Sequence, residues 1–86
     1  MSAARQDFPS DFPIKVMGRH DSDLRSLTQA IVERHAGPIA DSSVKTRTSA
    51  DGNFLALTYV VHATSREQLD KIYRELTACK SVLMAL

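Results

Sequence analysis

Between Phe54 and Ala63 the chain carries its longest run of residues that favour a buried, extended backbone, FLALTYVVHA. The run is rich in β-branched and aromatic side chains and contains neither proline nor glycine. Successive side chains of a strand point to opposite faces of a sheet, and both faces of this run carry apolar side chains. A strand of that kind is typical of a sheet interior, so we predict that residues 54–63 form a central strand.

Alternation of apolar and polar residues predicts three further strands. One covers residues 12–17 and ends at Gly18, and another covers residues 81–86, with Val82, Met84 and Leu86 on one face. Residues 43–50 alternate with little apolar content, which is typical of an edge strand. The sequence Asp51-Gly52-Asn53 then predicts a hairpin into the central strand.

Helical spacing predicts two helices. Asp21 is a residue type that caps helix N-termini, and Gly37-Pro38 ends the first helix. We expect Thr64 to cap the second helix, with Glu67 reaching back in a capping box. The two apolar stripes consist of Leu24, Leu27, Ile31 and His35, and of Leu69, Ile72, Tyr73 and Leu76.

The element order predicts an α+β, ferredoxin-like βαββαβ fold, with a four-stranded antiparallel sheet and two helices on one face. We expect one such domain over residues 12–86, preceded by a lead-in over residues 1–11. In this layout we expect the strands at 12–17 and 54–63 to be parallel central neighbours. The core would contain Phe12, Ile14, Val16, Leu27, Ile31, Leu57, Tyr59, Val61, Leu69, Ile72, Leu76, Val82 and Met84.

Composition narrows the function classes. A hydrophobic content of 43% and a charged content of 24% are ordinary for a globular protein. The net charge of +1 gives no general attraction to nucleic acid or to anionic membranes. A single cysteine, Cys79, excludes an internal disulfide and a cysteine-built metal site. No run has the features of a signal peptide or a membrane span, so we expect a cytoplasmic protein.

The sheet face opposite the helices is expected to be half apolar and is a predicted interface. A bare face of this kind is usually covered by a tail or a second subunit. We therefore expect homodimer formation, with Phe8 of the lead-in as the competing cover. The expected residues of this open face are Lys15, Met17, Lys45, Arg47, Phe54, Ala56, Thr58, Val60, His62 and Leu83.

Several short segments resemble a known family. They are Phe8-Pro9, the run FPIKVMG from Phe12 to Gly18, Gly52-Asn53-Phe54, and Ala63-Thr64 with Glu67-Gln68. Over residues 8–86 the chain is similar to the YbeD-like small bacterial proteins, and FPIKVMG is the most specific segment. The resemblance implies a ferredoxin-like fold similar to the ACT regulatory domains of amino-acid metabolism. It also implies a cytoplasmic bacterial setting, and it supplies no catalytic residues.

The first candidate site follows from the expected parallel strands. If these strands end together, both helices begin at one corner, where backbone N–H groups and positive dipole ends converge. Such a corner could hold a small carboxylate or phosphate, and the ACT-like analogy favours the same place. Its residues would be Gly18, Arg19, His20, His62, Thr64 and Arg66. The alternative is that Gly18 serves a turn and that the arginines are solvated.

Three other functions find less support in the sequence. His20, His62 and Asp21 match no zinc spacing, so no metal or other cofactor is expected. Lys15, Lys45 and Arg47 make the open face basic, which keeps a nucleic-acid-binding domain as the alternative function. However, the basic-aromatic motif of RNA-recognition sheets is missing. We see no catalytic set, so the sequence favours a non-enzymatic regulatory or interaction module that binds a small anion or a protein.

Overall fold

The computed structural model describes residues 9–20 and 23–86, so the predicted cap Asp21 and the lead-in residue Phe8 lie outside the described residues. The elements are β1 (Ser10–Arg19), α1 (Leu24–Ala36), a 3-10 turn (Asp41–Ser43), β2 (Val44–Thr48), β3 (Phe54–Ala63), α2 (Arg66–Ala78) and β4 (Val82–Ala85). This order confirms the ferredoxin-like α+β fold. β1 begins two residues earlier than predicted, inside the segment assigned to the lead-in.

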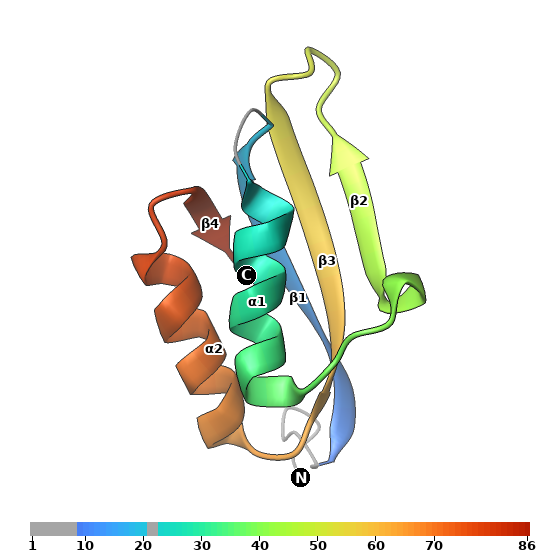
Figure 1. Ribbon diagram of the computed structural model, residues 1–86, viewed down its shortest axis with the longest axis vertical. Coiled ribbons are helices and arrows are strands. Elements are labelled where there is room, and N and C mark those ends of the chain that lie inside the picture. The colour runs from blue at the N-terminus through green and yellow to red at the C-terminus, as the bar shows by residue number, and fades with distance from the viewer. Residues whose placement is uncertain (1–8, 21–22) are drawn as a thin grey trace, which may run out of the picture.

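The four strands form one sheet in the order β2-β3-β1-β4, and every pair of neighbours is antiparallel. Both helices lie against one face of this sheet, side by side and in opposite directions (Figure 1). The prediction that the strands at 12–17 and 54–63 run parallel is wrong. A crossover through a helix returns the chain in its original direction, whereas the β2–β3 hairpin reverses it, and β1 therefore opposes β3.

The central pair, β1 and β3, is aligned over ten residue pairs, from Ser10 opposite Ala63 to Arg19 opposite Phe54. Pro13 lies within this central strand, where proline is normally excluded because it lacks an N–H group. Backbone groups of alternate residues point to opposite neighbours, and β4 extends along β1 only as far as Lys15. The side of Pro13 that lacks the N–H group therefore faces no strand of the described residues.

The core lies between the sheet and the two helices and matches most of the predicted set. Leu57, Tyr59 and Val61 of β3 are buried there against both helices, as predicted. Leu27 is an exception, because 44% of it is exposed and Thr28 is buried in its place. The fully buried residues of α1 and α2 are Leu24, Thr28, Val32, Ile72 and Leu76.

Thr28 is acceptable in the core because its hydroxyl is fully hydrogen-bonded. It donates to the carbonyl oxygen of Leu24 at 2.7 Å, and the Tyr59 hydroxyl lies 2.6 Å away. A threonine hydroxyl has only one hydrogen, so Tyr59 is the donor in the second bond. Burial raises the pKa of Tyr59, which keeps this donor protonated. The bond ties α1 to the centre of the sheet.

The side chains of β4 do not all point to the predicted faces of the sheet, because the pairing of β4 with β1 is irregular. Val82 lies opposite Gly18 and Met84 opposite Met17, which leaves Leu83 as an extra residue at the irregularity. Val82 and Ala85 therefore pack against the core, whereas Met84 lies on the open face and is 50% exposed. The prediction that Met84 belongs to the core is wrong.

The second helix is capped one residue later than predicted. Ser65, not Thr64, is the N-cap, and its hydroxyl accepts a hydrogen bond from the backbone N–H of Gln68 at 3.1 Å. The Gln68 side chain accepts from the backbone N–H of Thr64 at 2.7 Å and donates to the carbonyl oxygen of His35 at 2.9 Å. Gln68, rather than Glu67, thus completes the cap and links it to the end of α1.

We expect Leu57→Ala to lower the free energy of unfolding by about 2–5 kcal/mol, because a fully buried side chain is lost and a cavity remains. Val60→Thr, three positions along β3 on the opposite face, is the control and should change stability by about 0.5 kcal/mol or less. Urea unfolding followed by circular dichroism measures both. Equal losses in the two variants would contradict the facing assigned to β3.

We expect Gly18→Ala to destabilise the fold by about 1–3 kcal/mol, the usual cost of overpacking. A Cβ atom at Gly18 would clash with the backbone oxygen of Ser81 and would lie 2.8 Å from Cδ1 of Leu24. Relief requires a shift of the chain before β4, so thermal unfolding should report the loss. A variant as stable as the parent would show that β4 does not approach β1 this closely.

Candidate functional site: a basic trough on the open sheet face

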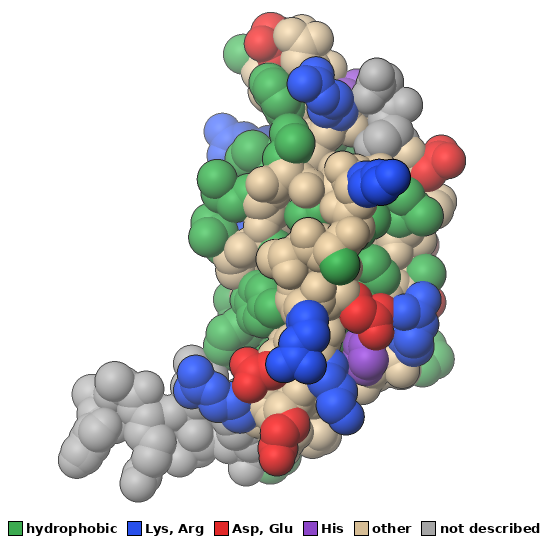
Figure 2. Space-filling model, turned by 90° about the vertical axis from the view of Figure 1, so that its left-hand side faces the viewer, with side chains coloured by type: hydrophobic (Ala, Val, Ile, Leu, Met, Phe, Trp, Pro, Cys, Tyr) green, Lys and Arg blue, Asp and Glu red, His purple; other side chains and the backbone are tan. Residues whose placement is uncertain are grey.

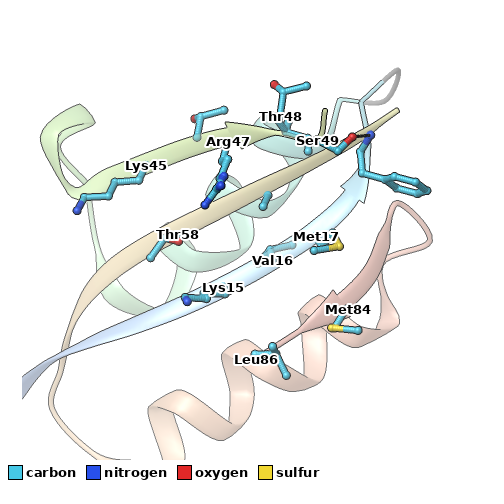
Figure 3. A pocket seen from close by; sticks show the side chains of 14 residues that line it. Lys15, Val16, Met17, Lys45, Arg47, Thr48, Ser49, Thr58, Met84 and Leu86 are labelled. Carbon is cyan, nitrogen blue, oxygen red and sulfur yellow. Dashed lines mark hydrogen bonds between the residues drawn. The ribbon is translucent and has the colours of Figure 1, made fainter. Parts of the chain in front are cut away.

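The open face of the sheet is hollowed along β3 because two small residues stand at its centre. Ala56 and Thr58 form the floor, and the longer side chains of the neighbouring strands form the walls. In the strand pairing, Arg47 and Met17 flank Ala56. Lys45 and Lys15 flank Thr58, as Figure 3 shows. We call these six residues the basic trough. The hollow of about 680 Å³ continues over Met84 and Leu86 of β4.

Antiparallel pairing explains why the cations gather here. Lys45 and Lys15 both lie directly opposite Thr58, one on each side, and Arg47 follows two residues after Lys45 on the same face of β2. Side chains directly opposite each other across an antiparallel pair have Cβ atoms about 4.5–5.5 Å apart. The register alone therefore places a lysine on each side of Thr58 and an arginine beside the neighbouring Ala56.

These three cations have no acidic partner among the described residues. The ion pairs of this part of the chain lie elsewhere, between Arg25 and Asp41, between Arg34, His35 and Glu75, and between His62 and Asp11. The side of the molecule that carries α2 differs, because positive and negative side chains are interspersed over its lower half (Figure 2). The basic trough is thus a local concentration of one sign of charge on a protein of net charge +1.

An exposed apolar margin lies beside the cations. Met17 is 40% exposed, and Met84 and Leu86 of β4 are 50% and 66% exposed. Met17 and Met84 face each other across β1 and β4, and Leu86 pairs with Lys15 through two backbone hydrogen bonds of 2.8 and 2.9 Å. One half of the hollow is therefore cationic and the other half is apolar.

The corner site predicted for small anions does not form, because its geometry depended on parallel strands. Gly18 pairs with Leu55, whereas Thr64 follows the opposite end of β3. At about 3.3 Å per residue, nine positions along β3 place Gly18 and Thr64 about 30 Å apart. Arg19 and His20 thus lie at one end of the sheet, and His62, Thr64 and Arg66 lie at the other.

Gly18 has a structural role in place of the predicted ligand contact, since it is buried against Ser81 and Leu24. At its end of the sheet, Arg19 and His20 line a small depression with Gly52 and Asn53. At the far end, Nδ1 of His62 lies 3.4 Å from a carboxylate oxygen of Asp11. The residues of the predicted corner therefore lie in two separate places, at opposite ends of the sheet.

The predicted interface residues do share one face. Lys15, Met17 and Arg47 are exposed in the basic trough, with Phe54 half-buried at one end of it. Val60 is 37% exposed and lies beyond Thr58 on the same side of β3. Their role in binding stays a prediction.

Metal sites and membrane spans are not found in the described part of the chain. Over residues 9–20 and 23–86, no three His, Cys, Asp or Glu side chains are close enough together to hold a metal ion. Within the same residues, neither α1 nor α2 has the length and apolar content of a membrane-spanning helix.

The sequence predicted the cations and Met17 on the open face, but it predicted neither the hollow between them nor the exposure of Met84 and Leu86 there. The small side chains at Ala56 and Thr58, alternating on one face of a predicted central strand, are the signal that could have revealed the floor. Met84 was missed because it was assigned to the core. The alternation of apolar and polar residues in this segment does not reveal the irregular pairing that turns Met84 outward.

Comparison with known proteins identifies relatives of this chain and assigns no activity. The chain is 44% identical over 80 residues to a UPF0250 protein of Ralstonia nicotianae, covering 93% of this chain and 82% of that protein. It is 47% identical over 81 residues to a UPF0250 protein of Chromobacterium violaceum, with 93% and 90% covered. A Bordetella pertussis relative is 49% identical over 71 residues, with 81% and 77% covered.

A family model matches almost the whole length, from residue 3 to residue 86. The resemblance drawn from the sequence, to a family of small bacterial proteins, is thereby confirmed. The chain belongs to the family described as "Protein of unknown function (DUF493)".

Proposed function

We propose that this protein is a non-catalytic interaction module that binds an acidic partner protein through the basic trough. The observation that carries the proposal is the set of three cations, Lys15, Lys45 and Arg47, gathered without a carboxylate partner among the described residues and beside an exposed apolar margin. The cytoplasm remains the proposed location.

Charge favours an acidic partner over a second copy of this chain. If two open faces met around a twofold axis, each would bring its own Lys15, Lys45 and Arg47 to the contact. Like charges brought together across an interface cost several kcal/mol. The carboxylate of Asp11 is the nearest compensation on β1, and it lies at the far end of that strand beside His62. Homodimerisation through this face is therefore the outcome that the proposal disfavours.

Side-chain chemistry favours protein over nucleic acid. Sheets that bind single-stranded RNA stack bases on aromatic side chains of the two central strands. Here the central positions of the open face hold Lys15, Met17, Ala56 and Thr58, and the aromatic Phe54 stands at one end. Methionine side chains suit adaptable apolar contacts with protein surfaces. The trough therefore offers charge and apolar area but no platform for stacking.

A binding role also fits the groups in the trough better than catalysis does. The hydroxyl on its floor, that of Thr58, stands between two lysines and has no histidine or carboxylate partner among the described residues. Activation of a hydroxyl nucleophile needs an adjacent base in hydrogen-bond reach. The regulatory role of the ACT-like analogy is compatible with such a module, because those domains act by binding.

The test is capture from nuclease-treated bacterial extract by the immobilised protein. We expect Lys15→Glu, Lys45→Glu and Arg47→Glu together to reduce the captured acidic protein at least tenfold, since reversed rim charges oppose association. The matched control reverses Lys71, Arg74 and Lys80, which are exposed on or just after α2, and lowers the net charge by the same amount. Capture by this control should equal that by the parent.

Three results would reject the proposal. Equal capture by both triple variants would place the partner elsewhere, and capture seen only from extract without nuclease treatment would favour nucleic acid. Sedimentation gives the third result: a dimer at tens of micromolar that Val60→Asp splits without unfolding would make the open face a self-association surface. We expect a monomer instead, because of the unpaired cations.

A further inference from the structure

We propose that the acidic partner binds as an extended segment that adds a strand to the free edge of β2. This inference rests on the proposed function for the charge of the partner, and it is carried by a different observation, the backbone of β2. Extended segments commonly bind in this way, with main-chain hydrogen bonds supplying affinity and alternate side chains supplying specificity.

β2 is an edge strand with one neighbour, β3, and neither helix lies over it (Figure 1). Only Val44 is half-buried, and the four residues that follow it to Thr48 are exposed. Thr46 and Thr48 point toward the helix side of the sheet and yet remain exposed, because the helices cover the other three strands. The edge is therefore accessible along its length.

The unused backbone groups of this edge can be assigned. The N–H of Ser49 donates to the carbonyl oxygen of Phe54 at 2.9 Å, so this pair is a hydrogen-bonded one. Hydrogen-bonded and non-bonded pairs alternate in an antiparallel ladder, and Arg47 and Lys45 therefore also bond to β3. The N–H and C=O groups of Thr46 and Thr48 point outward, where they are free to bind another strand.

The side chains of β2 define the sequence that such a strand should have. Residues beside Lys45 and Arg47 would lie on the open face, next to two positive charges, and should be glutamate or aspartate. Residues beside Thr46 and Thr48 would lie on the other face and should be small and β-branched. Opposite charges and β-branched residues both form favourable cross-strand pairs. The expected partner segment alternates acidic residues with valine or threonine.

A second copy of β2 does not meet this requirement. In antiparallel self-pairing centred on Thr46, Lys45 of one chain would face Arg47 of the other, and both pairs would be repulsive. Registers centred on Lys45 or Arg47 place identical cations opposite each other. The other edge strand, β4, has four residues and an irregular pairing with β1, so it offers a shorter and less regular edge.

The probe is an eight-residue peptide, blocked at both ends, in which glutamate alternates with valine and threonine. The test variant is Thr46→Pro, which removes an outward N–H group but no bond to β3. Proline is tolerated in edge strands at such positions. We expect it to weaken peptide binding about tenfold or more, through one lost hydrogen bond and a steric block. The control, Thr46→Val, keeps the N–H group and should bind like the parent, and a peptide with lysine in place of glutamate should not bind.

Amide hydrogen exchange by nuclear magnetic resonance gives a second readout on the unaltered protein, which decides the matter even if Thr46→Pro does not fold. Saturating peptide should slow exchange at Thr46 and Thr48, whose N–H groups are free in the structure. Exchange at Lys45 and Arg47 should change little, because these groups already bond to β3.

The outcomes separate this inference from the proposed function. Unchanged exchange at Thr46 and Thr48, with peptide-induced shifts at Lys15 and Thr58, would place the peptide across the trough. Strand addition would then be wrong and the proposed function would stand. Strand addition would also be wrong, and the proposed function unaffected, if no acidic peptide binds but charge-dependent capture is observed. Absence of both would reject both.

Discussion

The antiparallel pairing of β1 with β3 is the constraint on which the rest of the structure depends. Its ten residue pairs fix which side chains of both central strands face the helices. A slip of one residue would turn the buried side chains of one of the two strands to the open face, either Ile14 and Val16 or Leu57 and Tyr59, so the core strongly selects this register. The same register places Lys15 and Thr58 side by side on the outer face. The core thus determines the geometry of the surface on the other side of the sheet.

Local pattern predicted the elements well and their directions poorly. Alternation at residues 12–17 and 54–63 identifies two central strands, but a strand has the same alternation when it is read in either direction. The relative direction depends on how many reversals lie between the strands, here one hairpin. The corner built from Gly18 and Thr64 was lost for this reason, even though each residue lies at the end of its predicted strand.

The burial of some individual residues was predicted less well, because tertiary contacts decide which side chains are buried. Leu27 is more apolar than Thr28, yet α1 turns Thr28 to the core, where its hydroxyl is hydrogen-bonded to Tyr59. The extra residue at the irregular pairing interrupts the alternation of β4, so Met84 lies on the open face although Val82 faces the core. The cations of the basic trough were predictable because they lie on β1 and β2 well inside regular pairing. The hollow between them depends on neighbours that are distant in sequence.

The charges on β2 serve two requirements at once. An exposed edge strand risks pairing with any other exposed strand, and lysine or arginine on the edge is a common protection. Here Lys45 and Arg47 face the open side and add to the field of Lys15 across β3. The charges that repel a second copy of β2 are therefore those that favour an acidic strand. In the proposed complex, protection against self-association and selection of a partner come from the same two side chains. A change that made this edge neutral would weaken both.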